Sequence, residues 1–393
     1  MATENNNKTL NVPNLRFPEF SGEWEKYRLK DIANISKERI GINMLSNNNY
    51  ISTENMKSDF GGVDVAINLP ASGNVIKFQK GDTLLSNIRP YLKKIWQAKF
   101  DGGCSADIFV FRSNILCNSD FLYYTLANEK FISYAMSGAK GVKMPRGDKE
   151  QILKYELHLP TTIEQNKITS FLSLLDERIA TQIKIIEKLE SLIRGLITDV
   201  NSGRIAQCKS VYLRDLLIEQ HEKNTNNNEV CSVSVSQCVI NQIDYLGRSF
   251  AAKEVLHYNV VNCGDIVYTK SPTGEFPYGI VKRSDITKPV AVSPLYGVYR
   301  PINDYVGRYL HLYFKSPINA KNYLHKLIQK GAKNTINITN QHFLDNKILI
   351  PEKGWLDKIV KFAAAIEMKI ATENKVLQTL QQQKDYLLSK MFI

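Results

Sequence analysis

The chain has 393 residues, a formal net charge of +12 and a sequence pI of about 9.2, with 43% hydrophobic and 23% charged residues. The length exceeds that of one ordinary domain, and the composition excludes fibrous and disordered proteins. The excess of positive charge favours a polyanionic partner, of which nucleic acid is the commonest, although a generically basic protein has the same balance.

Cysteine usage and hydropathy exclude several further classes. The six cysteines form no C-x-x-C pair and have no histidine cluster beside them, so neither structural zinc nor a secreted disulfide framework is expected. No apolar run approaches the roughly 18–20 residues of a membrane span, and residues 1–10 are polar and rich in asparagine, unlike a signal peptide. We therefore expect reduced thiols, a disordered lead-in over residues 1–15 and a cytoplasmic protein.

Two globular domains are predicted, and both mix short strands with a helix. Runs of β-branched or aromatic residues bounded by Gly, Pro, Asn or Asp predict the strands. The first domain spans residues 1–160, with strands at 75–78, 107–111 and 156–159 and a helix over 119–137. The second spans residues 204–350, with strands at 230–235, 265–268, 291–299 and 348–350 and a helix over 304–330.

A long helix follows each domain. The first is predicted over residues 161–203, between Pro160 and a stop at Gly203, and the second over 351–393, after Pro351. In both, apolar residues recur at steps of mostly three and four, which is typical of a coiled-coil seam. We expect the following residues to pair: Leu172, Leu175, Ile179, Ile183, Ile186 and Ile193 in the first helix, and Phe362, Ile366, Ile370, Leu377, Leu380 and Leu387 in the second.

The sequence contains an internal repeat. Five short matches recur in the same order at offsets of 183 to 193 residues. They join 29–31 with 213–215, 81–82 with 264–265, 138–140 with 331–333, 159–160 with 350–351, and 178–181 with 369–372. Each match alone is weak, but the shared order predicts a tandem duplication of one unit, a globular part followed by a long helix.

The duplication also predicts how the helices pair. Two copies related by a pseudo-twofold axis across their helices must have those helices antiparallel. About 37 residues at roughly 1.5 Å each make a rod of about 55 Å, which would let two heads engage DNA at multiples of roughly 34 Å. The predicted fold class is therefore α+β, with two tandem mixed α/β domains whose helices pack as an antiparallel coiled coil. The alternative is that each helix packs back on its own domain.

The sequence shows no convincing catalytic constellation. It lacks the G-x-x-x-x-G-K-[ST] motif of nucleotide hydrolysis, and it lacks both the Asn-Pro-Pro-aromatic tetrapeptide and the glycine-rich loop of base methylation. A nuclease-like Glu367-Met368-Lys369 lies on the second long helix, where a solvated charge pair is the simpler interpretation. His158, between two leucines, is interpreted as a packing residue.

Basic loops are the remaining functional candidates, with ordinary charged surface turns as the alternative. Arg89 is suited to a guanine edge or a phosphate, and Tyr91 to stacking or a phosphate, while Lys93 and Lys94 would neutralise backbone charge. A second loop combines small residues, which allow close approach to a phosphate, with three cations. These cations are Lys140, Lys143 and Arg146, and the second domain offers Lys270, Thr273, Tyr278, Lys282, Lys330, Lys333 and Asn334.

The turns before these loops match between the two copies, whereas the residues after them differ almost completely. Two heads with one scaffold and different contact loops would read two different sequences. We therefore predict a bipartite, asymmetric DNA site.

Several motifs resemble one known family. They are residues 13–18 (PNLRFP), 22–25 (GEWE), 81–94 (GDTLLSNIRPYLKK) and 174–179 (LLDERI), together with Leu159-Pro160 leading into Gln165. In these motifs and in its two-domain, two-helix order, essentially the whole chain resembles the specificity subunit of Type I restriction–modification enzymes. In the second copy, residues 365–369 (AIEMK) replace the Leu-Asp-Glu-Arg stretch, which leaves the contacts of that helix open.

The resemblance implies a non-catalytic subunit that binds double-stranded DNA, one half-site per domain, with the helices setting the gap. It also implies two methyltransferase subunits that use S-adenosylmethionine to methylate adenine, and restriction subunits that use ATP and Mg. The chain itself is expected to bind no cofactor and no metal. A coiled-coil scaffold with incidental basic charge, and a self-sufficient nuclease, are the competing hypotheses.

Overall fold

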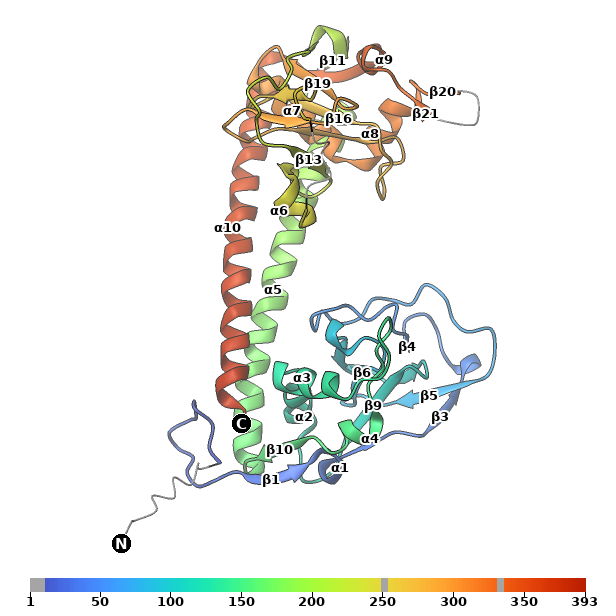
Figure 1. Ribbon diagram of the computed structural model, residues 1–393, viewed down its shortest axis with the longest axis vertical. Coiled ribbons are helices and arrows are strands. Elements are labelled where there is room, and N and C mark those ends of the chain that lie inside the picture. Colours follow the sequence, from blue (N-terminus) through green and yellow to red (C-terminus); the bar gives the residue numbers. More distant parts are fainter. Residues whose placement is uncertain (1–10, 249–253, 331–335) are drawn as a thin grey trace. The chain divides into compact units, whose positions relative to one another are not determined.

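The computed structural model describes residues 11–248, 254–330 and 336–393. The chain divides into two compact units. Unit 1 comprises Met1–Gln182 and Val376–Ile393, and unit 2 comprises Ile183–Lys375. Each unit therefore contains a globular part and a stretch of both long helices (Figure 1). None of the helices in the described ranges is both long and apolar enough to cross a membrane.

Unit 1 is built on two four-stranded sheets. The first has the order β2-β9-β6-β7 and is antiparallel throughout. The second has the order β3-β5-β8-β4, in which β4 runs parallel to β8. A further antiparallel pair, β1 with β10, precedes the first long helix. The strands are β1 Glu25–Arg28, β2 Ala33–Ile35, β3 Arg39–Gly41, β4 Tyr50–Ile51, β5 Asn74–Phe78, β6 Thr83–Ser86, β7 Ile95–Gln97, β8 Gly102–Cys104, β9 Ile108–Ser113 and β10 Glu156–Leu159.

Short helices pack against the first sheet of unit 1 and close its main core. The helix predicted over 119–137 is two helices, because Asn128 interrupts it. The Asn128 side chain accepts a hydrogen bond from the Lys130 backbone N–H, as an N-cap does, and donates to the Leu388 carbonyl at 3.1 Å. The helices are α1 Leu29–Ile32, η1 Ile42–Met44, η2 Pro90–Leu92, α2 Ser119–Leu126, α3 Glu129–Ser137 and α4 Lys149–Ile152.

Unit 2 repeats the first sheet and the terminal strand pair of unit 1, and its remaining strands form the two-stranded sheets β13-β14, β15-β18 and β20-β21. Its four-stranded sheet has the order β12-β19-β16-β17, and the pair β11 with β22 corresponds to β1 with β10. The strand predicted over 291–299 is two strands, since a turn joins the Tyr296 N–H to the Ser293 carbonyl between them. The strands are β11 Cys208–Tyr212, β12 Leu217–Glu219, β13 Cys231–Ser234, β14 Cys238–Asn241, β15 Asn259–Val261, β16 Ile266–Thr269, β17 Ile280–Arg283, β18 Val290–Val292, β19 Gly297–Pro301, β20 Gln329–Lys330, β21 Ile336–Asn337 and β22 Lys347–Pro351.

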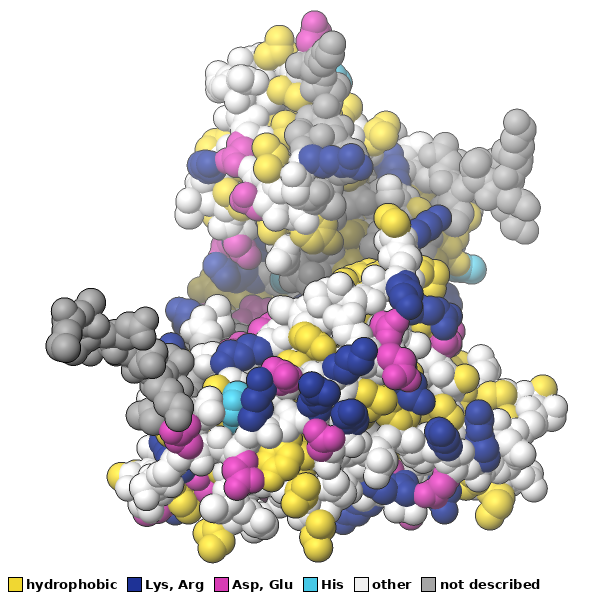
Figure 2. All heavy atoms as spheres, turned by 60° about the horizontal axis from the view of Figure 1, so that its bottom comes forward, with side chains coloured by type: hydrophobic (Ala, Val, Ile, Leu, Met, Phe, Trp, Pro, Cys, Tyr) yellow, Lys and Arg dark blue, Asp and Glu magenta, His cyan; other side chains and the backbone are white. Residues whose placement is uncertain are grey.

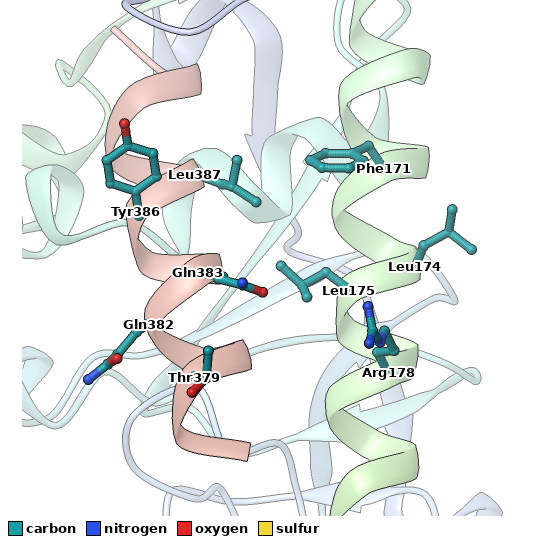
Figure 3. A pocket seen from close by; sticks show the side chains of 9 residues that line it. All are labelled: Phe171, Leu174, Leu175, Arg178, Thr379, Gln382, Gln383, Tyr386 and Leu387. Carbon is teal, nitrogen blue, oxygen red and sulfur yellow. The ribbon is translucent and has the colours of Figure 1, made fainter. Parts of the chain in front are cut away.

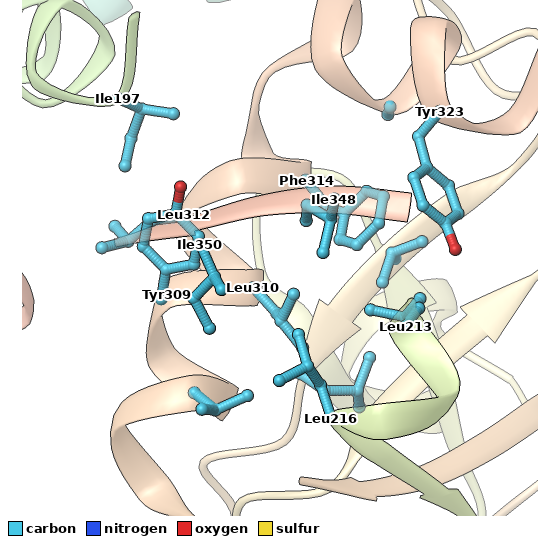
Figure 4. Close-up of a cluster of buried hydrophobic side chains, with 14 of the residues drawn as sticks. Ile197, Leu213, Leu216, Tyr309, Leu310, Leu312, Phe314, Tyr323, Ile348 and Ile350 are labelled. Carbon is cyan, nitrogen blue, oxygen red and sulfur yellow. The ribbon is translucent and has the colours of Figure 1, made fainter. Parts of the chain in front are cut away.

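The helices of unit 2 enclose its core, in which Tyr309 and Phe314 lie near Ile348 and Ile350 (Figure 4). The helix predicted over 304–330 ends at Lys315, because Pro317 follows and has no N–H to continue the ladder. Residues 329–330 belong to a strand instead. The helices are η3 Leu213–Asp215, α6 Gln242–Leu246, α7 Asp304–Lys315, α8 Pro317–His325 and α9 Asn340–Leu344.

The same glycine–aspartate turn opens the central strand of both sheets. Gly81 and Gly264 have φ of 93° and 92°, a left-handed conformation that glycine adopts without strain. The aspartates after them are 3% and 1% exposed. Asp82 accepts two hydrogen bonds from the Arg112 guanidinium, at 3.0 and 2.8 Å, and Asp265 accepts one from Arg300 at 3.2 Å. The expected duplication is thus present in side-chain contacts as well as in strand order.

The two long helices are α5 Thr162–Asn201 and α10 Lys353–Met391. Within unit 1 they lie side by side and antiparallel: Phe171 lies near Leu387, and Arg178 lies near Thr379 (Figure 3). Lys384 of α10 forms an ion pair with Asp176 of α5 at 2.7 Å. At this end, Leu172 and its neighbour Ile168 are also part of the globular core.

Within unit 2 the other halves of α5 and α10 enter one core, and Ile193, Ile197, Ile359 and Ile366 are among its buried residues. Pairing of the helices is thereby confirmed within each unit. Each helix also packs on the globular part, as the alternative interpretation of the apolar stripes predicted. Two of the predicted seam residues were wrong: Phe362 is 50% exposed while the adjacent Ala363 is buried, and Ile183 is 39% exposed.

Replacing Asp82 with Ala should lower the free energy of unfolding of unit 1 by about 2–4 kcal/mol, because Arg112 loses its buried partner. Urea titration followed by tryptophan fluorescence tests this. A Trp355→Phe background leaves only Trp24 and Trp96, both in unit 1, as reporters.

The matched control for this prediction is Asp64→Ala, which removes an exposed carboxylate paired with Lys57 at 2.7 Å. An exposed pair of this kind contributes less than about 1 kcal/mol. An equal decrease in the free energy of unfolding of the two variants would show that the contact between buried Asp82 and Arg112 does not hold the sheet.

Candidate nucleic-acid interface

The first basic candidate, residues 87–94 (loop A), leaves the end of β6 in an unusual backbone conformation. Arg89 and Lys93 have φ of 50° and 53°, so both are left-handed although neither is glycine, and the η2 turn lies between them. Such conformations persist only where surrounding contacts hold them. They leave Tyr91 at the tip of the turn with 46% of its surface exposed.

Loop A lies against the second basic candidate, residues 138–147 (loop B). The Arg89 N–H donates to the Pro145 carbonyl at 2.8 Å, and the Gly147 N–H donates to the Asn87 carbonyl at 3.0 Å. Ile88 and Arg146 form an antiparallel bridge. The structure therefore brings together two loops that sequence analysis singled out separately.

Most cations of the two loops already have partners inside unit 1. Lys93 is paired with Glu129 and lies 3.8 Å from Asp59, and Lys94 donates to the Thr53 carbonyl at 2.6 Å. In loop B, Lys140 pairs with Asp148 at 2.6 Å, and Arg146 pairs with Asp107 at 2.9 Å. The hydrogen bond between Lys140 and Asp148 raises the pKa of the lysine and lowers the pKa of the carboxyl. These cations would have to exchange partners in order to bind phosphates.

Three groups remain available for a ligand. The Nε of Arg89 and the side-chain oxygen of Asn87, at the start of loop A, are buried and form no hydrogen bond with any described residue. Lys143 is exposed and forms no ion pair with any described residue. Sequence analysis overlooked Asn87, although an asparagine directly after a buried strand was a usable signal.

The equivalent loop of unit 2 is less basic than expected. Lys270 is partly buried, and desolvation lowers its pKa. Thr273 is exposed at a turn that its backbone closes with Phe276. Tyr278 is partly buried, with its ring 5.8 Å from that of His325. The side chain of Lys330 is not described, and Lys333 and Asn334 lie outside the described residues.

Lys282 was placed on the DNA-contacting surface by sequence analysis, and its burial contradicts that placement. It lies on β17 with only 2% of its surface exposed, and its Nζ is 5.8 Å from the centre of the Phe276 ring. Strand register causes this, because Lys282 pairs with buried Val267 of β16.

Beside Lys282, the Arg283 N–H donates to His311 Nδ1 at 3.2 Å. Desolvation, together with the neighbouring cations of Lys282, Lys315, Arg283 and Arg308, lowers the pKa of His311 to about 3. This histidine is therefore neutral at neutral pH and acts as a hydrogen-bond acceptor.

Charges are mixed on the part of unit 1 that Figure 2 brings forward. Lys and Arg side chains there alternate with Asp and Glu side chains instead of forming one uninterrupted basic patch. Binding to a polyanion would consequently depend on particular loops more than on the net charge.

The described residues contain no group of three or more His, Cys, Asp or Glu side chains that could hold a metal ion. The nuclease-like Glu367 forms an ion pair with Lys315 at 3.4 Å, as expected of a charged pair on a helix surface. The nitrogen Nδ1 of His158, on β10, is buried without a hydrogen-bond partner, and desolvation lowers the pKa of this histidine.

Comparison with known proteins shows what this chain resembles. Residues 21–191 match the family model of the Type I restriction modification DNA specificity domain. The resemblance to specificity subunits of Type I restriction–modification enzymes, inferred from the motifs, is confirmed.

Individual relatives extend the comparison. The chain is 22% identical to the Type I restriction enzyme EcoDI specificity subunit of Escherichia coli over 192 residues, 48% of this chain and 41% of that protein. It is 24% identical to the MjaVIII specificity subunit of Methanocaldococcus jannaschii over 92% of this chain and 88% of that protein.

Two solved structures share the fold. The Type I restriction–modification S subunit from M. genitalium matches with a TM-score of 0.57 and 14% identity, over 97% of this chain and 99% of the other. A chain from a study of complex assembly and conformational transition of the type I R-M system matches with a TM-score of 0.52 and 15% identity, over 94% and 97%.

The neutral His311 predicts a pH dependence of stability. In the unfolded chain a histidine takes up a proton below pH ~6.5, but the folded state resists protonation until the pH approaches the lowered pKa. Stability should therefore fall as the pH drops through this window. His311→Gln should reduce the slope between pH 6.5 and 4.5 by up to about 1.4 kcal/mol per pH unit, measured by urea unfolding.

His325→Gln, which removes an exposed imidazole on α8, is the matched control. If both substitutions change the slope equally, the dependence does not originate at His311.

Proposed function

We propose that this chain is the non-catalytic DNA sequence-specificity subunit of a Type I restriction–modification complex in the cytoplasm. Each unit reads one half of a bipartite, asymmetric site in double-stranded DNA, and the long helices set the gap. The chain docks two methyltransferase subunits and the restriction subunits. S-adenosylmethionine, ATP and Mg are used by those partners, and this chain binds none of them.

The observation that carries the proposal is a repeated scaffold with unlike loops. The sheets β2-β9-β6-β7 and β12-β19-β16-β17 have the same strand order and the same buried Asp–Arg contact. The segments after β6 and β16 nevertheless differ in sequence and in backbone conformation. One scaffold with two different contact loops is suited to reading two different half-sites.

Loop A supplies groups suited to reading bases. An arginine can bond to two acceptors of guanine, and an asparagine to the donor and acceptor of adenine, in the major groove. Arg89 and Asn87 both have buried polar atoms that bond to no described residue, and a base edge would satisfy them. The exposed Lys143 of loop B is suited to a phosphate.

The paired helices supply a surface for protein partners. In unit 1, a groove between α5 and α10 exposes 41% of Phe171, 63% of Leu174 and 59% of Tyr386 (Figure 3). Exposed apolar groups gathered in this way mark protein interfaces. This groove supports the docking of methyltransferase subunits, and a pure coiled-coil scaffold would also use it.

Adenine-methylation mapping distinguishes a DNA specificity subunit from a coiled-coil scaffold. The chain is expressed with its methyltransferase partner in a host that lacks native systems, and the genome is sequenced for methylated adenine. We expect one new split motif with a fixed gap. The control is the same methyltransferase with an unrelated specificity subunit; activity with the control but none with this chain would favour the scaffold.

Arg89→Ala should weaken binding of the assembled complex to its own site by about 1–3 kcal/mol and relax the preference at one position of the first half-site. The salt dependence should change little if Arg89 reads a base, and by roughly one counterion if it holds a phosphate. Electrophoretic mobility shift on DNA altered in either half-site measures both effects.

The matched control for Arg89 is Lys80→Ala, an exposed cation of the same unit outside both loops. If Arg89→Ala loses the same binding free energy on cognate and on unrelated DNA, Arg89 contacts a phosphate and does not read a base.

A further inference from the structure

Unit 2 contains a cavity of about 300 Å³ whose lining combines an apolar wall with a buried ammonium group. Ile193 of α5, Phe276 and Lys282 of β17 are among the residues that line it. Its volume is at the lower end of the range for small-molecule sites. We call it the Lys282 cavity.

Lys282 is a charged group without a counter-ion. It is 98% buried, no hydrogen bond or ion pair joins it to a described residue, and its Nζ lies 5.8 Å from the centre of the Phe276 ring. Burial lowers the pKa of its ammonium group. Burying an unpaired ammonium group costs free energy. An anion that enters the cavity would therefore form a strong ion pair with Lys282.

The fold does not itself require a cation at this place. In unit 1 the strand register pairs Leu84 with Trp96, and in unit 2 it pairs Val267 with Lys282. Since Leu84 and Val267 are equivalent positions after the glycine–aspartate turn, Lys282 stands where unit 1 has a tryptophan. Trp96 is part of an apolar core. An apolar side chain therefore satisfies the same position of the scaffold.

The cavity lining also holds a helix N-terminus and two more cations, of which Lys315 pairs with Glu367 at 3.4 Å. Ser316 and Pro317 at the N-terminus of the nine-residue helix α8 line the cavity, together with Lys315 and Arg194. A helix N-terminus and nearby cations both stabilise anions. Two acids also line the cavity: Glu190 lies 3.8 Å from Arg194, and Glu275 is exposed. Among the described cations of the lining, Lys282 is thus the one that forms no ion pair.

We propose that the Lys282 cavity is a binding site for a small molecule with one anionic group, a carboxylate or a phosphate, on an apolar body. The anionic group pairs with Lys282, and the apolar body lies against Ile193 and Phe276. A bound ligand would connect α5 with β17 and α8 and so stabilise unit 2. This site is separate from the DNA-reading loops.

The test is a thermal-unfolding titration of the full-length chain, with phenyl phosphate and benzoate as probes. Benzyl alcohol tests the apolar body without the charge, and inorganic phosphate tests the charge without the body. At saturation we expect the first two to raise Tm by about 2–4 °C, and the last two to raise it less. Sodium chloride at matched ionic strength controls for screening.

Lys282→Met should abolish the shift with both probes and leave the ligand-free Tm unchanged or higher, because it removes an unpaired buried charge. Lys321→Met, an exposed lysine on α8 away from the cavity, is the matched control and should keep the shift. Equal shifts in Lys282→Met and the unsubstituted chain, or no shift with any probe, would overturn the proposal.

Discussion

The buried carboxylate after each glycine–aspartate turn is the constraint on which both units depend. Asp82 accepts hydrogen bonds from Arg112 and from the Gln79 N–H, and Asp265 accepts them from Arg300 and the Asn262 N–H. Each carboxylate therefore fixes the start of a central strand to the neighbouring strand and to its own turn. Removing the arginine would leave the buried carboxylate uncompensated, which is more costly than losing a surface pair.

Because each central strand is fixed at its start, the loop that follows its end can vary in sequence. In unit 1 the end of β6 leads into a strained turn that loop B supports by backbone hydrogen bonds, so side chains there can differ without disturbing the sheet. In unit 2 the same strand end leads into a different turn. This division between a rigid scaffold and variable loops is how binding sites on many folds are built, and it underlies the proposed reading of two unlike half-sites.

Charge in this protein is used locally. Most loop cations of unit 1 are held by acids or carbonyls of the same unit, whereas Lys282 of unit 2 is buried and forms no ion pair with a described residue. The formal charge of +12 therefore overstates the number of cations that are ready for a polyanion. The proposed contacts depend on the few groups whose polar atoms have no partner.

The sequence by itself determined the features that arise from local patterns. The order of five short matches, the apolar stripe of two helices and the glycine–aspartate turns predicted a duplicated α+β fold with long paired helices, because periodicity and turn chemistry act over a few residues. Pro317 was a local signal as well, and the interpretation of 304–330 as one helix passed over it. Tertiary structure decided what depends on distant segments. The contact of loop A with loop B, the pairing of Lys93 with Glu129, and the burial of Lys282 follow from strand register and from the packing of residues far apart in the chain, which no local pattern encodes.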